Sequence, residues 1–133
     1  MRFMLDTDSC IALIKRKPAT MLHKITSFAP GEVGLSAVAL SELRYGVAKS
    51  TQKETNSRAL DEFLLPLEIA DFDETAADAY GEVRATLEKA GTPVGPLDTQ
   101  IAAHALSLGA VLVTHNTREF RRIPGLAVED WLA

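Results

Sequence analysis

Apolar residues recur along this chain in two patterns, short continuous runs and series spaced three to four residues apart. A continuous run bounded by turn residues is typical of a buried strand, and the wider spacing is typical of one face of a helix. The run 110–114 is the most strand-like segment, whereas Met21, Leu22, Ile25 and Phe28 mark the apolar face of a helix. The two patterns alternate from one end of the chain to the other.

These patterns and the turn residues between them predict five strands and six helices. We expect strands at 2–6, 33–36, 67–70, 110–114 and about 126–129. The first expected helix is capped by Asp8 or Ser9 and ends at Ile14, and the second runs from Pro18 through Phe28. Four further helices are expected at 37–49, 52–64, 73–89 and about 97–108. Strands separated by helices form a mainly parallel sheet with helices on both faces. The sequence therefore predicts an α/β fold of three layers, α/β/α, as one domain over residues 1–133.

The composition fits a folded protein with one core. The chain has 133 residues, of which 47% are hydrophobic and 24% charged, a balance that argues against disorder. Its apolar runs are too short to span a membrane, and Asp6 interrupts the first run too early for a signal peptide. The one cysteine, Cys10, has apolar neighbours and is expected to be a buried thiol. We therefore expect no internal disulfide and a cytoplasmic location.

The net charge is negative, but the basic residues are clustered. A formal charge of -4 weighs against binding of nucleic acid through a broad basic surface. One basic cluster is 15–17, which solvated helix ends explain equally well. The other contains Arg118, Arg121 and Arg122, next to Glu119. This second cluster can meet a phosphate backbone if Glu119 belongs to a site.

Four acidic residues lie near a predicted strand end or helix start, namely Asp6, Glu42, Asp98 and Glu119. In a parallel sheet, ligands bind at the carboxyl ends of the strands, where the helix starts also gather. Carboxylates that converge raise each other's pKa values unless a cation neutralises them, and no Lys or Arg adjoins Asp6 or Asp98 closely. Oxygen ligands of this kind favour a hard divalent metal ion, Mg²⁺ or Mn²⁺. The pattern therefore indicates metal-assisted phosphodiester chemistry.

Each acid taken alone also has a simpler explanation. These explanations are helix-start positions for Asp98 and Asp8, and surface ion pairs of Glu42 with Arg44 or Lys49 and of Glu119 with Arg122. Two histidines stay outside the predicted site. His104 lies in mid-helix among small residues, where packing or solvent exposure suits it, and His115 is expected to point away from Asn116.

Four stretches match one family, in family order and over nearly the whole chain. They are residues 4–8 (MLDTD), 41–46 (SELRYG), 95–103 (GPLDTQIAA) and 112–120 (LVTHNTREF). On these stretches the sequence resembles a PIN-domain ribonuclease of the VapC type, the toxin of a type II toxin–antitoxin pair. The last two stretches are the most specific.

The resemblance implies a metal site. In the family, the acids that match Asp6 and Asp98 bind Mg²⁺, and the acid that matches Glu42 completes the cluster. Those three residues are therefore the expected metal ligands, with Mn²⁺ as an alternative ion.

The resemblance also implies further catalytic residues. Thr114 and Asn116 match the polar pair after the penultimate strand of the family. Many PIN domains have an Asp at or near the position of Asn116, whereas an amide adds no negative charge. Glu119 is expected to supply the missing carboxylate, and fewer acids favour one tightly bound metal ion over two.

The resemblance implies an activity and partners as well. We expect Mg²⁺-dependent hydrolysis of RNA, with a tRNA and the anticodon loop of initiator tRNA as targets, and hence inhibition of translation. We also expect a homodimer, a VapB-type antitoxin, and a toxin–antitoxin complex that binds operator DNA. The helices at 21–28 and 52–64 offer apolar surface for these contacts. Two other functions stay open, a phosphatase of the haloacid dehalogenase type that uses Asp6 and Asp8, and a non-enzymatic regulatory protein.

Overall fold

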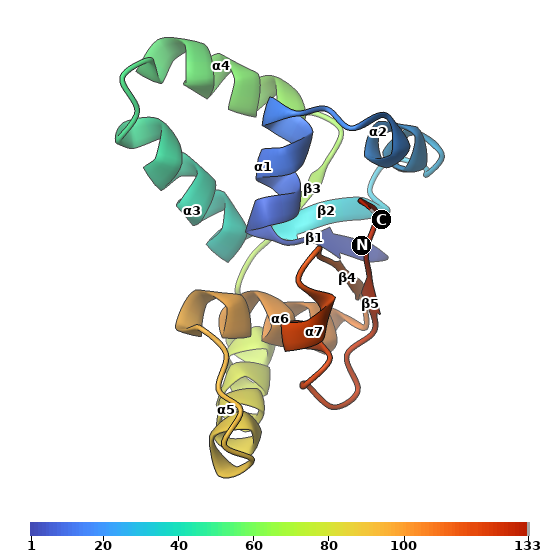
Figure 1. Ribbon diagram of the computed structural model, residues 1–133, viewed down its shortest axis with the longest axis vertical. Coiled ribbons are helices and arrows are strands. Elements are labelled where there is room, and N and C mark those ends of the chain that lie inside the picture. Colours follow the sequence, from blue (N-terminus) through green and yellow to red (C-terminus); the bar gives the residue numbers. More distant parts are fainter. Residues whose placement is uncertain (133) are drawn as a thin grey trace.

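Among residues 1–132, which the computed structural model describes, five strands form one parallel sheet (Figure 1). The strands are β1 (Phe3–Leu5), β2 (Val33–Ser36), β3 (Glu68–Ala70), β4 (Val111–Val113) and β5 (Val128–Glu129). They lie in the order β3-β2-β1-β4-β5, and each neighbouring pair is parallel. The predicted number of strands and their direction are confirmed.

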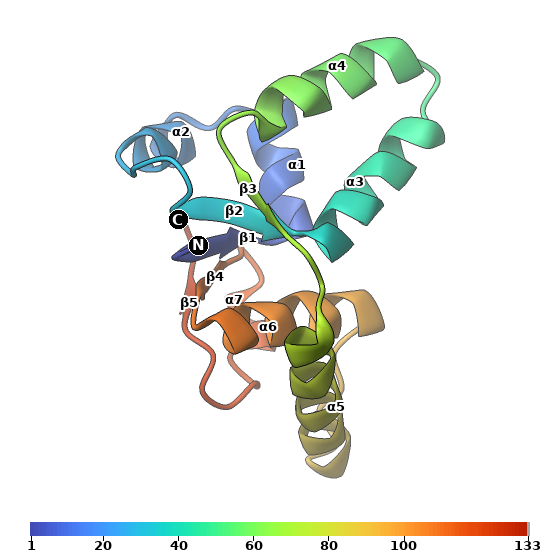
Figure 2. The same ribbon diagram turned by 180° about the vertical axis from the view of Figure 1, so that it is seen from behind.

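Helices cover both faces of this sheet (Figure 1, Figure 2). One side carries α1 (Thr7–Lys15), α2 (Ala19–Thr26), α3 (Ala37–Ala48) and α4 (Lys53–Leu64), and the other carries α5 (Glu74–Lys89) and α6 (Pro96–Leu108). A short helix, α7 (Thr117–Phe120), follows β4. The α3–α4 hairpin and α5 extend away from the sheet in opposite directions. The predicted three-layer α/β/α fold is confirmed.

The central strands are buried on both faces. Met4, Leu5, Leu35, Leu112 and Val113 have no exposed surface. Burial of such a side chain contributes about 1.5–3 kcal/mol relative to exposure. This burial explains why the strands are continuous apolar runs rather than alternating ones. No helix in the described part of the chain combines the length and apolar character that a membrane span needs.

Two local predictions are wrong, and the other elements agree with their predicted bounds to within two residues. The carboxylate of Asp6, rather than Asp8 or Ser9, caps α1, because it accepts a hydrogen bond from the Ser9 N–H at 2.8 Å. The chain turns from β1 into α1 without a loop, so one residue both ends the strand and caps the helix. Helix α7 is absent from the prediction because its four residues are too few to show apolar residues repeating every three to four positions.

Gly34 allows β2 to approach β3 closely. A Cβ atom at this position would lie 2.2 Å from the carbonyl oxygen of Glu68. That oxygen belongs to the backbone of the neighbouring strand, so it cannot rotate away as a flexible side chain would. A larger residue at this position therefore has to push the two strands apart.

We expect Gly34→Ala to lower the free energy of unfolding by about 1–3 kcal/mol, because it overpacks the sheet. Urea unfolding followed by circular dichroism measures the change. Gly46→Ala in α3 is the matched control, since its added Cβ meets no atom within 4 Å. The control should raise the free energy of unfolding by about 0.5–1 kcal/mol, because Ala favours a helix over Gly. Equal effects of the two substitutions would contradict the close approach of the strands.

Candidate functional site

The predicted site residues lie at the point in the sheet where the strand connections on the two sides of β1 lead in opposite directions. From β1 the chain leads to β2 on one side, whereas β4 lies on the other side of β1. Asp6 follows β1 and Thr114 follows β4, and the Asp6 N–H donates to the carbonyl oxygen of Val113 at 3.0 Å. Open parallel sheets bind ligands at such a position, outside the carboxyl ends of the strands.

Asp6 is buried and held by hydrogen bonds, with only 4% of its surface exposed. The Ser9 N–H donates to its Oδ1, and the Ser9 hydroxyl donates to the carbonyl oxygen of Val113 at 3.1 Å. Burial raises the pKa of Asp6, and hydrogen bonds from Thr114 and Ser9 lower it in part. The carboxylate is therefore fixed in direction but costly to keep ionised.

Thr114 connects Asp6 to Asn116 and Glu119. The Thr114 hydroxyl oxygen accepts a hydrogen bond from the Asn116 N–H at 3.0 Å, so its own proton is available for Asp6. The Asn116 amide donates through Nδ2 to the Glu119 carboxylate. The ion pair with Arg122, which was the alternative explanation of Glu119, is absent from residues 1–132. Glu119 lies on α7, where Asn116 orients it.

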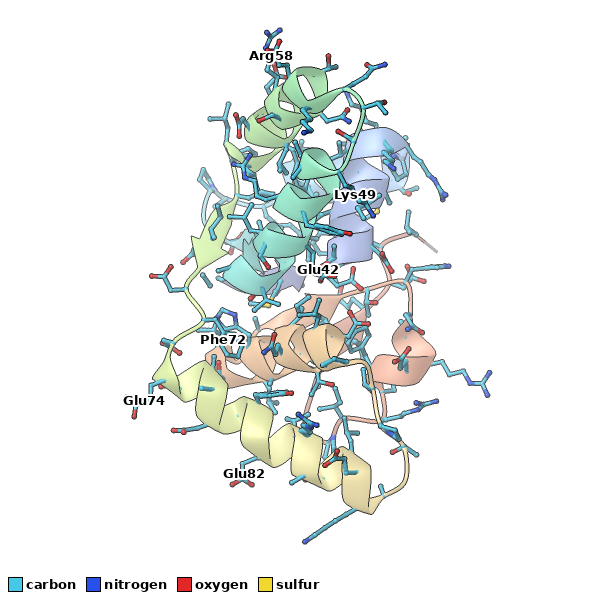
Figure 3. All side chains as sticks on the ribbon, turned by 90° about the vertical axis from the view of Figure 1, so that its left-hand side faces the viewer. Glu42, Lys49, Arg58, Phe72, Glu74 and Glu82 are labelled. Carbon is cyan, nitrogen blue, oxygen red and sulfur yellow. The ribbon has the colours of Figure 1, made fainter. Side chains whose placement is uncertain are left out.

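Glu42 enters the site from α3. It lies in the middle of α3, a helix that contacts α6 (Figure 3). The Thr7 hydroxyl donates to Glu42 Oε1 at 2.7 Å. Arg44, one of its alternative partners, instead forms an ion pair with Asp61 at 3.0 Å. Glu42 is therefore held by a hydroxyl and keeps its negative charge uncompensated by any Lys or Arg that the structure describes.

Asp98 is the residue on which the other charges converge. It lies half-buried in the first turn of α6, as predicted. Burial is the largest cause that raises the pKa of Asp98, followed by the negative charges of Glu42, Asp6, Glu119 and Asp8, and together they raise it to about 6. Acids from different parts of the chain, on β1 to α1, on α3, on α6 and on α7, therefore lie within electrostatic reach of one another.

The donor set fits a hard divalent cation. Every candidate ligand is a carboxylate oxygen, and the ion pairs among residues 1–132 involve none of the four acids Asp6, Glu42, Asp98 and Glu119. In the described residues, no three acidic, His or Cys side chains lie together at the spacing of a complete ligand set. Mg²⁺ does not need a complete set, because it keeps several waters and is usually held by one or two carboxylates rather than by a full protein cage.

The remaining candidates lie outside this acid cluster. His104 is buried, with 1% exposed, and its Nδ1 lies 2.8 Å from the Ser36 hydroxyl, so packing rather than exposure explains it. His115 Nδ1 lies 3.0 Å from Asp130 Oδ2. Cys10 is fully buried, and burial raises the pKa of its thiol, in agreement with a core position. Asp8 is an exposed residue of α1 rather than its cap.

Two positioning hydroxyls, those of Thr7 and Ser9, were not among the predicted site residues. Both lie in the first turn of α1, directly after Asp6. The available signal was a strand-terminal Asp followed by hydroxyl residues, since such residues at a helix start can hydrogen-bond backbone and side-chain acceptors nearby. Their partners, Glu42 and Val113, are too distant in sequence to be read from a local pattern.

The charge of Asp98 should make the metal-free protein less stable at neutral pH. Asp98 has a pKa of about 6 in the folded protein against an ordinary value of 3.8. Between these values the folded state keeps a proton that the unfolded state has lost, so the free energy of unfolding contributed by Asp98 falls as pH rises. We expect Asp98→Asn to stabilise the protein at pH 7 by on the order of 1 kcal/mol, discounted for partial exposure.

Urea unfolding in the presence of a chelator, at pH 7 and at pH 4, tests this expectation. The gain should shrink strongly at pH 4, because Asp98 of the folded wild-type protein is then protonated and, like Asn, carries no charge. Asp78→Asn, at an exposed position of α5, is the control and should change little with pH. A gain for Asp98→Asn that is equal at both pH values would contradict the electrostatic account.

Comparisons with known proteins agree with this geometry. The PIN domain family matches residues 3–126. The chain is 45% identical over 131 residues to the tRNA(fMet)-specific endonuclease VapC of Salmonella typhimurium, and 44% identical over 131 residues to the protein of that name from Shigella flexneri. Each alignment covers 98% of both proteins.

A solved structure has the same fold over nearly its whole length. The DNA-bound VapBC from Salmonella typhimurium superposes with a TM-score of 0.95 at 45% identity, covering 98% of each chain. The resemblance to VapC that the sequence motifs predicted is thereby confirmed. This chain belongs to the VapC family of PIN-domain proteins.

Proposed function

We propose that this chain is a Mg²⁺-dependent endoribonuclease and the toxin of a type II toxin–antitoxin pair. The observation that carries the proposal is the convergence of Asp6, Glu42, Asp98 and Glu119 at the ligand-binding edge of a PIN fold, without a cationic side chain to neutralise them. Nucleases with a PIN domain generally depend on a divalent metal ion. The names of the Salmonella and Shigella relatives support the assignment to RNA.

Asp6 and Asp98 are the proposed direct ligands of the metal ion, and Glu42 is the proposed third member. Asp6 is held in direction by Ser9, and Glu42 by Thr7, so two of the three carboxylates need no reorientation to bind a cation. Binding of a cation removes the repulsion that raises the pKa of Asp98, and the site should therefore bind metal more tightly above pH 6. Mn²⁺, which also prefers oxygen ligands, should substitute for Mg²⁺.

The proposed reaction is hydrolysis of an RNA phosphodiester bond. A bound divalent ion supplies a water of lowered pKa and stabilises negative charge that develops on the phosphate oxygens. Thr114 donates to Asp6, which holds that carboxylate in place and offsets part of the rise in pKa that burial causes. Asn116 and Glu119, joined by their hydrogen bond, line the same edge, where an amide and a carboxylate together can orient a water molecule. Glu119 thereby supplies the charge that Asn116 lacks.

The substrate and partners follow from relatives rather than from site geometry. The relatives' name supports a tRNA as substrate, with initiator tRNA and its anticodon loop as the specific proposal and inhibition of translation as the result. The VapBC structure supports a VapB-type antitoxin as partner, and its bound DNA supports operator binding by the complex.

We also propose a homodimer. Leu22 in α2 and Leu65 at the end of α4 are exposed and offer apolar surface for such contacts. The family assignment favours this function over the phosphatase alternative.

We expect Asp98→Asn and Asp6→Asn each to lower the rate of RNA cleavage by at least about 100-fold, because each removes a charged ligand of the metal ion. Asn at position 6 keeps an oxygen that can cap α1, so folding should survive, as circular dichroism and melting temperature can verify. Asp78→Asn is the charge-matched control and should cleave at the wild-type rate. A chelator should abolish wild-type cleavage, and Mg²⁺ or Mn²⁺ should restore it. Undiminished cleavage by either Asn variant would overturn the assignment.

Thr7→Val should lower cleavage by about 10–100-fold, because it removes the hydrogen bond that orients Glu42 while keeping the side-chain volume. Thr7→Ser retains a hydroxyl and should recover most of the rate. The comparison is made on cleavage rate as a function of Mg²⁺ concentration, where the Val variant should need more metal ion than the Ser variant. Indistinguishable metal dependence of the two variants would show that the hydroxyl does not act on the site.

A further inference from the structure

The segment that carries Glu119 also carries arginines without carboxylate partners. Elsewhere in the described chain, Arg44 and Arg84 form ion pairs with acids, and Arg2 lies over the rings of Phe3 and Phe28. Arg118, Arg121 and Arg122 are exposed and appear in none of the ion pairs among residues 1–132. Arg16 and Arg58 also appear in no ion pair among residues 1–132, but they are isolated from each other, whereas Arg118, Arg121 and Arg122 gather in one segment next to the acid cluster of a protein whose net charge is -4.

Residues 117–123, which we call the α7 segment, are held against the core rather than forming a loose loop. Phe120 and Ile123 are buried, with 1% and 2% exposed, and anchor it to the core. Arg122 donates through Nη1 to the carbonyl oxygen of Pro93 at 3.4 Å, which links the segment to the loop that leads into α6. With its apolar residues turned inward, this segment presents its arginines to solvent.

The same segment is tied to the acid cluster on its other side. Glu119 accepts from Asn116, the Asn116 N–H donates to Thr114, and Thr114 hydrogen-bonds with Asp6. This chain of contacts fixes the backbone of the α7 segment relative to the acid cluster. A ligand bound both at the carboxylates and along the α7 segment is therefore within reach of the arginines.

We propose that Arg118 and Arg121 bind the phosphodiester backbone of the RNA next to the phosphate that is cleaved. The proposal rests on the nuclease function proposed above and identifies the surface along which the RNA enters the site. The planar guanidinium fork matches two phosphate oxygens and stays charged at any working pH. Positive charge is needed here because the carboxylates repel RNA, and only the metal ion and adjacent cations offset that repulsion.

Binding of RNA at different salt concentrations tests the proposal. The probe is a fluorescein-labelled stem–loop from the anticodon arm of initiator tRNA, bound to Asp98→Asn protein so that cleavage does not interfere. We expect Arg118→Gln and Arg121→Gln, each added to that protein, to weaken binding and to reduce the slope of log K against log salt by about 0.7–0.9 per arginine. Arg58→Gln removes the same charge in the middle of α4, distant from α7, and is the matched control (Figure 3).

Kinetics of the arginine variants in the otherwise wild-type protein give a second readout. Each Gln variant should raise KM for RNA cleavage by about 3–10-fold, with a much smaller change in kcat, because it removes binding that the ground state and the transition state share. A merely structural role would instead lower the melting temperature, which should stay at the wild-type value.

The two proposals fail in different ways. If the wild-type protein cleaves RNA with Mg²⁺ but the salt slopes of the Arg118 and Arg121 variants equal that of the Arg58 control, only the α7 assignment is overturned. If the wild-type protein shows no metal-dependent cleavage of RNA, the nuclease function is overturned and the α7 assignment with it. If the Arg118 and Arg121 variants have a reduced slope of log K against log salt and the Arg58 control does not, the RNA-binding surface on the α7 segment is established.

Discussion

Mutual repulsion among carboxylates at one edge of the sheet is the constraint on which the functional part of this structure depends. Asp98 is raised to a pKa of about 6 by its own burial and by acids that come from three other parts of the chain. Such an arrangement is unfavourable for the isolated protein, so the fold has to hold each acid in place. The crossover topology brings β1 and β4 together, and buried apolar strands provide the stability that the acid cluster costs. A divalent cation turns the same repulsion into binding energy.

The hydroxyl residues around the acids explain how the cluster keeps its shape before any cation binds. Thr7 orients Glu42, Ser9 and Thr114 orient Asp6, and Asn116 orients Glu119. Each of these three acids therefore has a neutral donor rather than a basic partner. Positive charge instead lies on the exposed arginines of α7 and the residues after it, where it can attract an anionic ligand without neutralising the carboxylates. This separation of charges accounts for a nuclease with an acidic overall composition.

The sequence predicts most of the fold because its strongest signals are local. Apolar runs such as 110–114 and helix stops such as Gly109 locate the elements, and alternation of strands and helices predicts the parallel sheet. Asp6 and Asp98 were predictable for the same reason, since each lies next to such a signal. The contact between Thr7 and Glu42 was not predictable, because it joins residues 35 positions apart. Helix α7 and the capping role of Asp6 escaped prediction because each occupies too few residues to form a period.

The titration of the Asp98 side-chain carboxyl, followed by ¹³C NMR with and without Mg²⁺, tests the central claim most directly. In the metal-free protein the midpoint should lie near pH 6, because the neighbouring acids and burial oppose ionisation. Saturating Mg²⁺ should move the midpoint well below that value, because the cation removes the repulsion. A midpoint near the ordinary value of 3.8 in the metal-free protein, or one that Mg²⁺ leaves unchanged, would contradict the account.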